Sequence, residues 1–125
     1  MANKKIMLVD DEEDFLKLTK LNLEATGKYT VLVLSSGKDI LSHLHDFRPD
    51  IIILDLLMPK VGGIEICHML NDDPIGQRTP LIILSALYKD ADKLKAYKLG
   101  VLDYLVKPVD VDTLIFKIEK ALSKH

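Results

Sequence analysis

Five residues with reactive side chains lie at or directly after the ends of short apolar runs: Asp10, Asp11, Asp55, Ser85 and Lys107. If these ends meet in space, two carboxylates ~4 Å apart repel each other by about 4 kcal/mol at an effective dielectric constant of about 20. A proton or a divalent cation must relieve that repulsion. An all-oxygen site favours Mg²⁺, and zinc is disfavoured because no Cys or His accompanies these residues.

The same residues match the chemistry of a phosphoryl acceptor. Asp55 is the candidate nucleophile, whose carboxylate would attack phosphorus and form an aspartyl phosphate. Mg²⁺ and the Lys107 ammonium would neutralise charge on the phosphoryl oxygens, and the Ser85 hydroxyl would donate to them. Lys107 is expected to pair with Asp55 while no phosphoryl group is present.

The apolar runs that must position these residues predict a buried parallel sheet. They occupy residues 6–9, 31–34, 51–54, 81–84 and, more briefly, 104–106. None of them alternates apolar with polar residues, so helices are expected to cover both faces of each strand.

Segments with helical patterning separate the runs. Helices are expected over residues 11–26, ending at Gly27, around 40–49, and over 64–70, 91–97 and 111–122. Residues 71–80, which hold two prolines and one glycine, are expected to form an extended loop. Gly62 and Gly63 are expected to supply turns with positive φ.

Five alternations of strand and helix indicate an α/β fold, with a doubly wound five-stranded parallel sheet and right-handed crossovers. Ligands bind such sheets outside the carboxyl ends of the strands, where the reactive residues fall. The 125 residues are expected to form a single domain, residues 1–125, without the length for a second core.

Composition narrows the class of protein further. Hydrophobic residues make up 48% and charged residues 29%, as in a folded domain, and the net charge of -2 argues against binding nucleic acid by bulk charge. No apolar run approaches the roughly 20 residues of a membrane helix. Because the N-terminal residues lack a signal-peptide pattern, we expect a cytoplasmic protein. The single cysteine, Cys67, is expected to fill space in the core.

Four stretches carry a resemblance to a known family. They are residues 6–12, which include Asp10-Asp11-Glu12, residues 51–59 followed by Gly62-Gly63, residues 84–86, and residues 100–108. In this order, from Lys5 to Leu122, the chain resembles a bacterial response-regulator receiver domain, of the kind that also occurs alone in chemotaxis. The resemblance implies a flavodoxin-like (βα)₅ fold with strand order 2-1-3-4-5.

The resemblance also assigns roles to individual positions. It implies that Asp55 is phosphorylated and that Asp11 and Asp55 bind Mg²⁺ directly, with Asp10 acting largely through water. The backbone carbonyl of Leu57 supplies a further oxygen, and Ser85 and Lys107 bind the phosphoryl group.

The resemblance implies a switch beside this site. Tyr104 matches an aromatic residue that turns inward when Ser85 is drawn toward the phosphoryl group, and the small Ala86 leaves room for its ring. The bond between Lys107 and Pro108 is expected to be cis. The output surface would consist of the fourth helix, the fifth strand and the fifth helix.

The implied partners are a histidine kinase or a histidine phosphotransfer protein, and a downstream protein target or fused output domain. Dimerisation on activation is possible, whereas direct contact with nucleic acid or membrane is not expected. The domain would assist only its own phosphorylation and dephosphorylation, and would not otherwise be an enzyme.

Two positions that tune the phosphoryl lifetime in this family are apolar in this sequence, Leu57 and Leu87. Neither side chain can orient an attacking water, so slow self-dephosphorylation is expected; alternatively, the leucines merely cover the loop. Leu102 is likewise open to two interpretations, as an exposed contact beside the output surface or as ordinary loop packing.

Two other functions stay open. One is a Mg²⁺-dependent phosphatase of the haloacid-dehalogenase type, although such enzymes carry a second Asp where this sequence has Leu57. The other is an interaction module that works without phosphorylation, although the intact set of acids, Ser85 and Lys107 argues against it.

Overall fold

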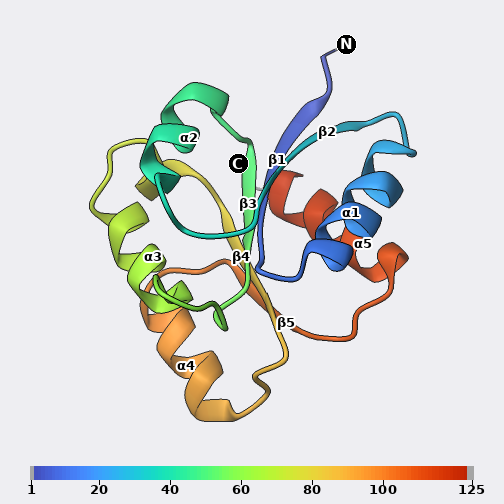
Figure 1. The fold of residues 1–125 in the computed structure, drawn as a ribbon. Helices are drawn as coiled ribbons and strands as arrows, with labels where there is room; N and C mark the ends of the chain where they lie inside the picture. Colours follow the sequence, from blue (N-terminus) through green and yellow to red (C-terminus); the bar gives the residue numbers. More distant parts are fainter. Residues whose placement is uncertain (1, 124–125) are drawn as a thin grey trace.

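The computed structural model describes residues 2–123, which form a parallel sheet flanked by helices (Figure 1). The strands are β1 (Lys4–Val9), β2 (Tyr29–Leu34), β3 (Ile51–Leu54), β4 (Leu81–Ser85) and β5 (Asp103–Val106). The helices are α1 (Glu13–Glu24), α2 (Ile40–Phe47), α3 (Gly63–Asn71), α4 (Asp90–Lys98) and α5 (Val111–Ser123), with a 3-10 helix η1 (Gly76–Arg78). Within the described residues, no helix is long and apolar enough to cross a membrane.

The sheet confirms the expected topology. Its strand order is β2-β1-β3-β4-β5, and all neighbouring strands run parallel. Helices α1 and α5 cover one face of the sheet, while α2, α3 and α4 cover the other (Figure 1). Because every crossover returns the chain to the same edge, the carboxyl ends of all five strands lie together.

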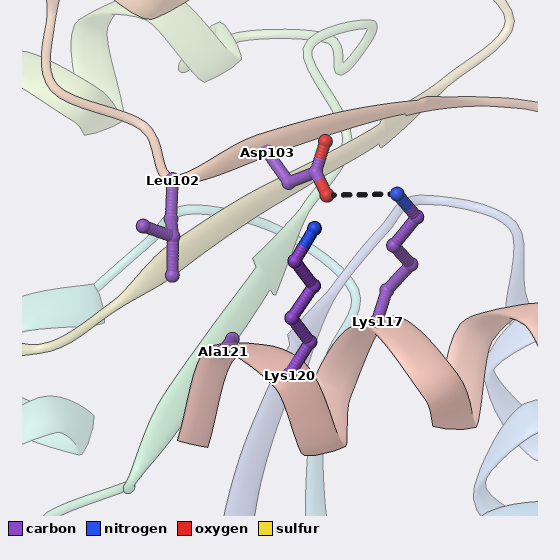
Figure 2. Close-up of a pocket in the computed structure, with 5 residues that line it drawn as sticks. All are labelled: Leu102, Asp103, Lys117, Lys120 and Ala121. Carbon is purple, nitrogen blue, oxygen red and sulfur yellow. Dashed lines mark ion pairs between the residues drawn. The ribbon is translucent and has the colours of Figure 1, made fainter. Parts of the chain in front are cut away.

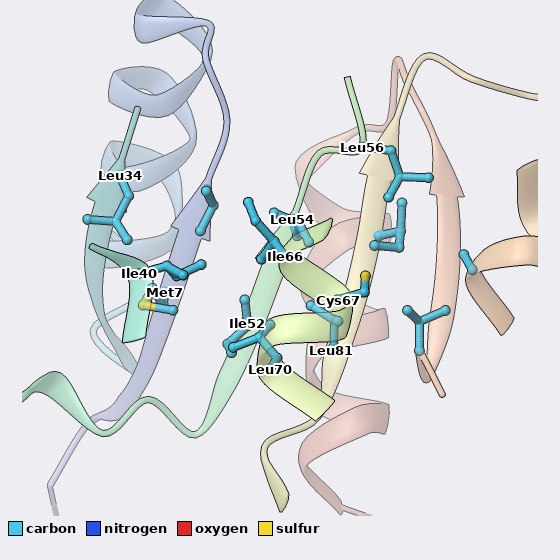
Figure 3. Close-up of a cluster of buried hydrophobic side chains, with 14 of the residues drawn as sticks. Met7, Leu34, Ile40, Ile52, Leu54, Leu56, Ile66, Cys67, Leu70 and Leu81 are labelled. Carbon is cyan, nitrogen blue, oxygen red and sulfur yellow. The ribbon is translucent and has the colours of Figure 1, made fainter. Parts of the chain in front are cut away.

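Two hydrophobic clusters, one on each face, explain the unbroken apolar runs. Met7 and Val9 of β1 belong to the cluster under α2, α3 and α4 (Figure 3), whereas Ile6 and Leu8 belong to the cluster under α1 and α5. Successive side chains of a strand point to opposite faces, so both positions of the alternation must be apolar. The central strands β3 and β4 are buried at every residue.

Cys67 is one of the buried residues of α3. Burial raises the pKa of its thiol to about 11, which keeps it protonated at neutral pH. The expectation that Cys67 fills space in the core is confirmed.

Local details differ from the expectations. Helix α1 begins at Glu13 and not at residue 11, and the segment 71–80 contains η1 where a plain loop was expected. The expected positive φ at Gly62 and Gly63 is wrong: Gly62 has a φ of -72°, and the positive φ in this loop belongs to Lys60, at 68°.

Glycine is required at position 63 for a different reason, because the start of α3 lies very close to the backbone that follows β3. A Cβ atom on Gly63 would lie 2.4 Å from Leu56 Cα and 2.7 Å from the backbone oxygen of Asp55, distances that backbone atoms cannot tolerate. A Cβ on Gly62 would meet nothing within 4 Å. Gly63 therefore lets α3 pack directly against the segment that follows β3.

We predict that Gly63→Ala lowers the free energy of unfolding by about 1–3 kcal/mol, because the helix or the Asp55–Leu56 backbone must shift. Gly62→Ala is the matched control, and its effect should stay within about 0.5 kcal/mol. Urea unfolding measures both. Equal stability of the two variants would contradict the close-approach explanation.

Candidate functional site

Three carboxylates converge at the carboxyl edge of the sheet. Asp10, Asp11 and Asp55 each offer one oxygen, and these oxygens all lie within 4.8 Å of one another. Asp10 and Asp55 are buried, whereas Asp11 is exposed. The expected gathering of acids is confirmed, and a set of hard oxygen donors open to solvent on one side fits a hard divalent cation such as Mg²⁺.

Strand pairing brings the two buried acids together. Val9 of β1 pairs with Leu54 of β3, so the residues that follow, Asp10 and Asp55, leave the sheet side by side. The ladder continues past the strands, because the Asp55 amide donates a 3.0 Å hydrogen bond to the Val9 carbonyl. The short apolar strands therefore fix the positions of both carboxylates.

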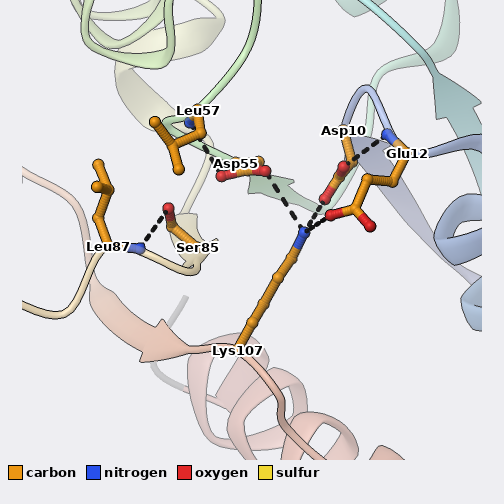
Figure 4. A network of polar contacts seen from close by, with 7 residues as sticks. All are labelled: Asp10, Glu12, Asp55, Leu57, Ser85, Leu87 and Lys107. Carbon is orange, nitrogen blue, oxygen red and sulfur yellow. Dashed lines mark hydrogen bonds and ion pairs between the residues drawn. The ribbon is translucent and has the colours of Figure 1, made fainter.

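The Lys107 ammonium lies among three carboxylates (Figure 4). Its Nζ is 2.7 Å from Asp10 Oδ2, 3.1 Å from Glu12 Oε1 and 3.4 Å from Asp55 Oδ2. The expected pairing with Asp55 is present, but it is the longest of the three contacts. Glu12 was not predicted as a site residue, and its only signal in the sequence is its place directly after Asp10 and Asp11.

Both buried carboxylates are held in the same way. Asp10 Oδ1 accepts the amide of Glu12 at 2.9 Å, and Asp55 Oδ1 accepts the amide of Leu57 at 3.0 Å. In each case the second oxygen faces Lys107. Each carboxylate is therefore anchored by its own turn on one side and by a shared cation on the other.

The electrostatics reflect burial and mutual pairing. Burial raises the pKa of Asp10, and the hydrogen bond from Lys107 offsets this only in part. Burial acts against the charged form of Lys107, but the hydrogen bond to Asp10 and the charge of Asp55 outweigh it, so the pKa of Lys107 is raised. Lys107 stays charged because the acids surround it.

Ser85 and Tyr104 lie beside the acids. The buried Ser85 Oγ accepts the amide of Leu87 at 3.3 Å, and the Ser85 carbonyl accepts the amide of Lys107 at 2.8 Å. The ring of Tyr104 is already inside, 7% exposed, with its hydroxyl donating to the Leu87 carbonyl at 2.8 Å. The Lys107–Pro108 bond is cis, as the resemblance implies.

The two leucines differ in exposure. Leu57 is 49% exposed, on the loop that holds Asp55, whereas Leu87 is half-buried and packs against the cluster under α2, α3 and α4. The Leu87 side chain therefore does cover the core in part, and the Leu57 side chain is open to water.

Leu102 directly precedes β5 (Figure 2), whereas Lys107 directly follows this strand. It is half-buried and packs against the cluster under α1 and α5, which supports ordinary loop packing. It lines a cavity of about 210 Å³ beside Lys120 and the ion pair between Lys117 and Asp103, 3.3 Å apart. This cavity does not contain the acidic cluster.

Comparisons with known proteins agree with the geometry. Residues 6–119 match the family model of the response regulator receiver domain. Over 106 residues the chain is 40% identical to the alkaline phosphatase synthesis transcriptional regulatory protein PhoP of Bacillus subtilis, a match that covers 85% of this chain and 43% of that protein. The chain spans about half the length of the curated relatives it matches.

Solved structures show the same fold. The receiver domain of the Francisella response regulator 1452 is similar with a TM-score of 0.88 and 32% identity, covering 98% of each chain. The Vibrio cholerae chemotaxis protein CheY4 is similar with a TM-score of 0.89 and 26% identity, covering 96% of this chain and 99% of that one.

We predict that Lys107→Met, which keeps the alkyl chain but removes the charge, lowers the free energy of unfolding at neutral pH by about 2–4 kcal/mol without divalent cations, because two buried carboxylates lose their shared partner. The deficit should shrink as the pH falls. Lys107 lowers the pKa of Asp10, so in the variant this pKa lies still further above its unfolded value, and the variant regains stability once Asp10 binds a proton.

Lys117→Met is the matched control for this prediction. It removes an ion pair whose side chains are 28% and 26% exposed, so its effect should stay under about 1 kcal/mol. Urea unfolding at neutral and mildly acidic pH measures both variants. A deficit in Lys107→Met that does not depend on pH would refute the electrostatic explanation.

Proposed function

The chain belongs to the response-regulator receiver family of two-component signalling, and on that premise we propose that it is a switch whose phosphoryl acceptor is Asp55. The observation that carries the proposal is the convergence of Asp10, Asp11 and Asp55 at the carboxyl edge of the sheet, where the Lys107 ammonium contacts Asp10 and Asp55. The ammonium beside Asp55 can stabilise negative charge that develops on a group transferred to that carboxylate.

The proposed step is a transfer from a histidine of a partner kinase or phosphotransfer protein. A carboxylate oxygen of Asp55 attacks phosphorus, the bond between phosphorus and the histidine nitrogen breaks, and that nitrogen keeps the electron pair. The Lys107 ammonium, 3.4 Å from Asp55 in this structure, donates to a phosphoryl oxygen, and so does the Ser85 hydroxyl. The domain thus assists its own modification and is not otherwise an enzyme.

The same edge supports a role for Mg²⁺. The carboxylates of Asp10, Asp11 and Asp55 and the backbone carbonyl of Leu57 would hold the ion. When bound, it supplies positive charge that offsets the charge of the carboxylates and of the transferred group. The exposure of Asp11 leaves this side of the cluster open to solvent, which gives the ion access.

Phosphorylation of Asp55 would change the output surface by way of Ser85 and Tyr104. A phosphoryl group on Asp55 would draw the Ser85 hydroxyl toward it and favour the inward ring of Tyr104, which this structure has. The surface of α4, β5 and α5 would then contact a downstream target or fused output domain, or a second copy. Exposed apolar side chains support this, namely Leu94 and Tyr97 on α4 and Phe116 on α5.

We predict that the protein with acetyl phosphate and Mg²⁺ gains the mass of one phosphoryl group, and that Asp55→Asn gains none, because an amide is a poor nucleophile. Chelation of Mg²⁺ should also prevent the gain. Asp14→Asn, which removes an exposed acid outside the cluster, is the control and should label normally. Intact-mass spectrometry of freshly quenched samples measures the gain.

The outcomes separate the candidate functions. Stoichiometric labelling of Asp55 supports the receiver switch. Multiple turnover of phosphate esters would support the haloacid-dehalogenase type of phosphatase, and absence of any label would support an interaction module that works without phosphorylation. A label that persists in Asp55→Asn would show that another residue is the acceptor.

We predict that the aspartyl phosphate survives for minutes after the donor is removed, because Leu57 is exposed beside the acceptor but cannot orient water. Leu57→Gln should shorten the lifetime roughly tenfold by offering water a hydrogen bond, whereas Leu57→Met should leave it unchanged. The decay of the labelled mass measures this. Loss of label within seconds in the unmodified protein would contradict the prediction.

A further inference from the structure

The Lys107 ammonium has a fourth neighbour besides its three carboxylates. Its Nζ lies 4.4 Å from the centroid of the Phe15 ring, well inside the ~6 Å range in which an aromatic face attracts a cation. Phe15 belongs to α1 and is half-buried against the cluster under α1 and α5. The ring is therefore held by packing on one side while it faces the Lys107 ammonium, whose side chain is 13% exposed, on the other.

The three N–H groups of Lys107 are all in use. Asp10, Glu12 and Asp55 each accept one hydrogen bond from the ammonium. An aromatic face attracts the charge without requiring an N–H group directed at a lone pair. The contact with Phe15 can therefore persist when the ammonium exchanges a carboxylate for another oxygen acceptor.

Phosphoryl transfer requires such an exchange. In the proposed function the Lys107 ammonium must donate to a phosphoryl oxygen on Asp55, and so must give up at least one present partner. The Glu12 carboxylate attracts the ammonium only weakly during this exchange. Its side chain is 65% exposed, so water and salt screen the attraction. The Phe15 ring is better shielded and does not compete for a hydrogen bond.

We propose that Phe15 is a positioning residue for phosphoryl transfer, whose ring keeps the Lys107 ammonium at the acceptor edge while its hydrogen-bond partners change. This inference rests on the proposed function. Phe15 touches neither the acceptor nor the phosphoryl group in this role; it acts through Lys107. A cavity of about 280 Å³ lined by Phe15, Lys107 and Pro108 leaves space beside the ring for small substituents.

Replacement of Phe15 tests the inference. Phe15→Leu keeps an apolar side chain for packing but removes the ring, and the rate of labelling by acetyl phosphate with Mg²⁺ should fall about three- to tenfold. Phe15→Tyr should keep most of the rate. Phe47→Leu, the same change at a half-buried ring that lies 5.4 Å from the Lys5 ammonium of β1, is the matched control and should leave the rate unchanged.

A fluorinated series separates the ring's electrostatics from its shape. Phenylalanine with increasing numbers of ring fluorines at position 15 should lower the rate progressively, because fluorine withdraws charge from the ring face. The proton NMR shifts of the Lys107 ε-methylene group, measured without Mg²⁺ or donor, should show a ring-current effect that Phe15→Leu removes.

The outcomes are distinguishable from failure of the proposed function. If the unmodified protein takes up no phosphoryl group, the proposed function fails and the role of Phe15 fails with it. If the unmodified protein labels and Phe15→Leu or the fluorinated series labels equally fast, only the role of Phe15 is overturned. A stably folded Phe15→Leu with a slow rate, rescued by Phe15→Tyr, supports the inference.

Discussion

The repulsion among three carboxylates at one edge of the sheet is the constraint on which the rest of this structure depends. Asp10 and Asp55 are buried, so water screens their charges poorly. The Lys107 ammonium offsets part of this repulsion, because it pairs with Asp10 and Asp55 of the cluster and also with Glu12. Because the charges at this edge of the sheet are balanced only in part by a single ammonium, the site responds strongly to any added charge. A phosphorylation switch needs this property.

The apolar sheet makes this balance possible. Strands β1, β3 and β4 are buried on both faces, so their carboxyl ends emerge from a region of low dielectric constant and little freedom of movement. The close packing of Gly63 against Leu56 and the Asp55 carbonyl extends this rigidity into the acceptor loop. The backbone atoms of Asp55 and Leu56 therefore serve two purposes, because they pack against α3 and also hold the Asp55 carboxylate in place.

The apolar pattern of the strands predicted the fold well, because it can be recognised from a few neighbouring residues and yet restricts the topology of the whole chain. A short, fully apolar run such as residues 51–54 must be covered on both faces, and alternation with helices leaves few topologies. Loop details were harder to predict. The positive φ lies at Lys60 and not at Gly62 or Gly63, because a close approach between α3 and the acceptor loop, which is absent from any local pattern, decides where glycine is needed.

The sequence by itself determined which kinds of groups gather at the edge, since Asp10, Asp55 and Lys107 follow apolar strands whose ends must coincide. Only the tertiary structure decided how they pair. Lys107 contacts Asp10 most closely, reaches Glu12 and lies over the Phe15 ring. A long side chain reaches several partners from one backbone position, so its contacts depend on how the fold brings Glu12 and Phe15 within its reach and not on spacing along the chain.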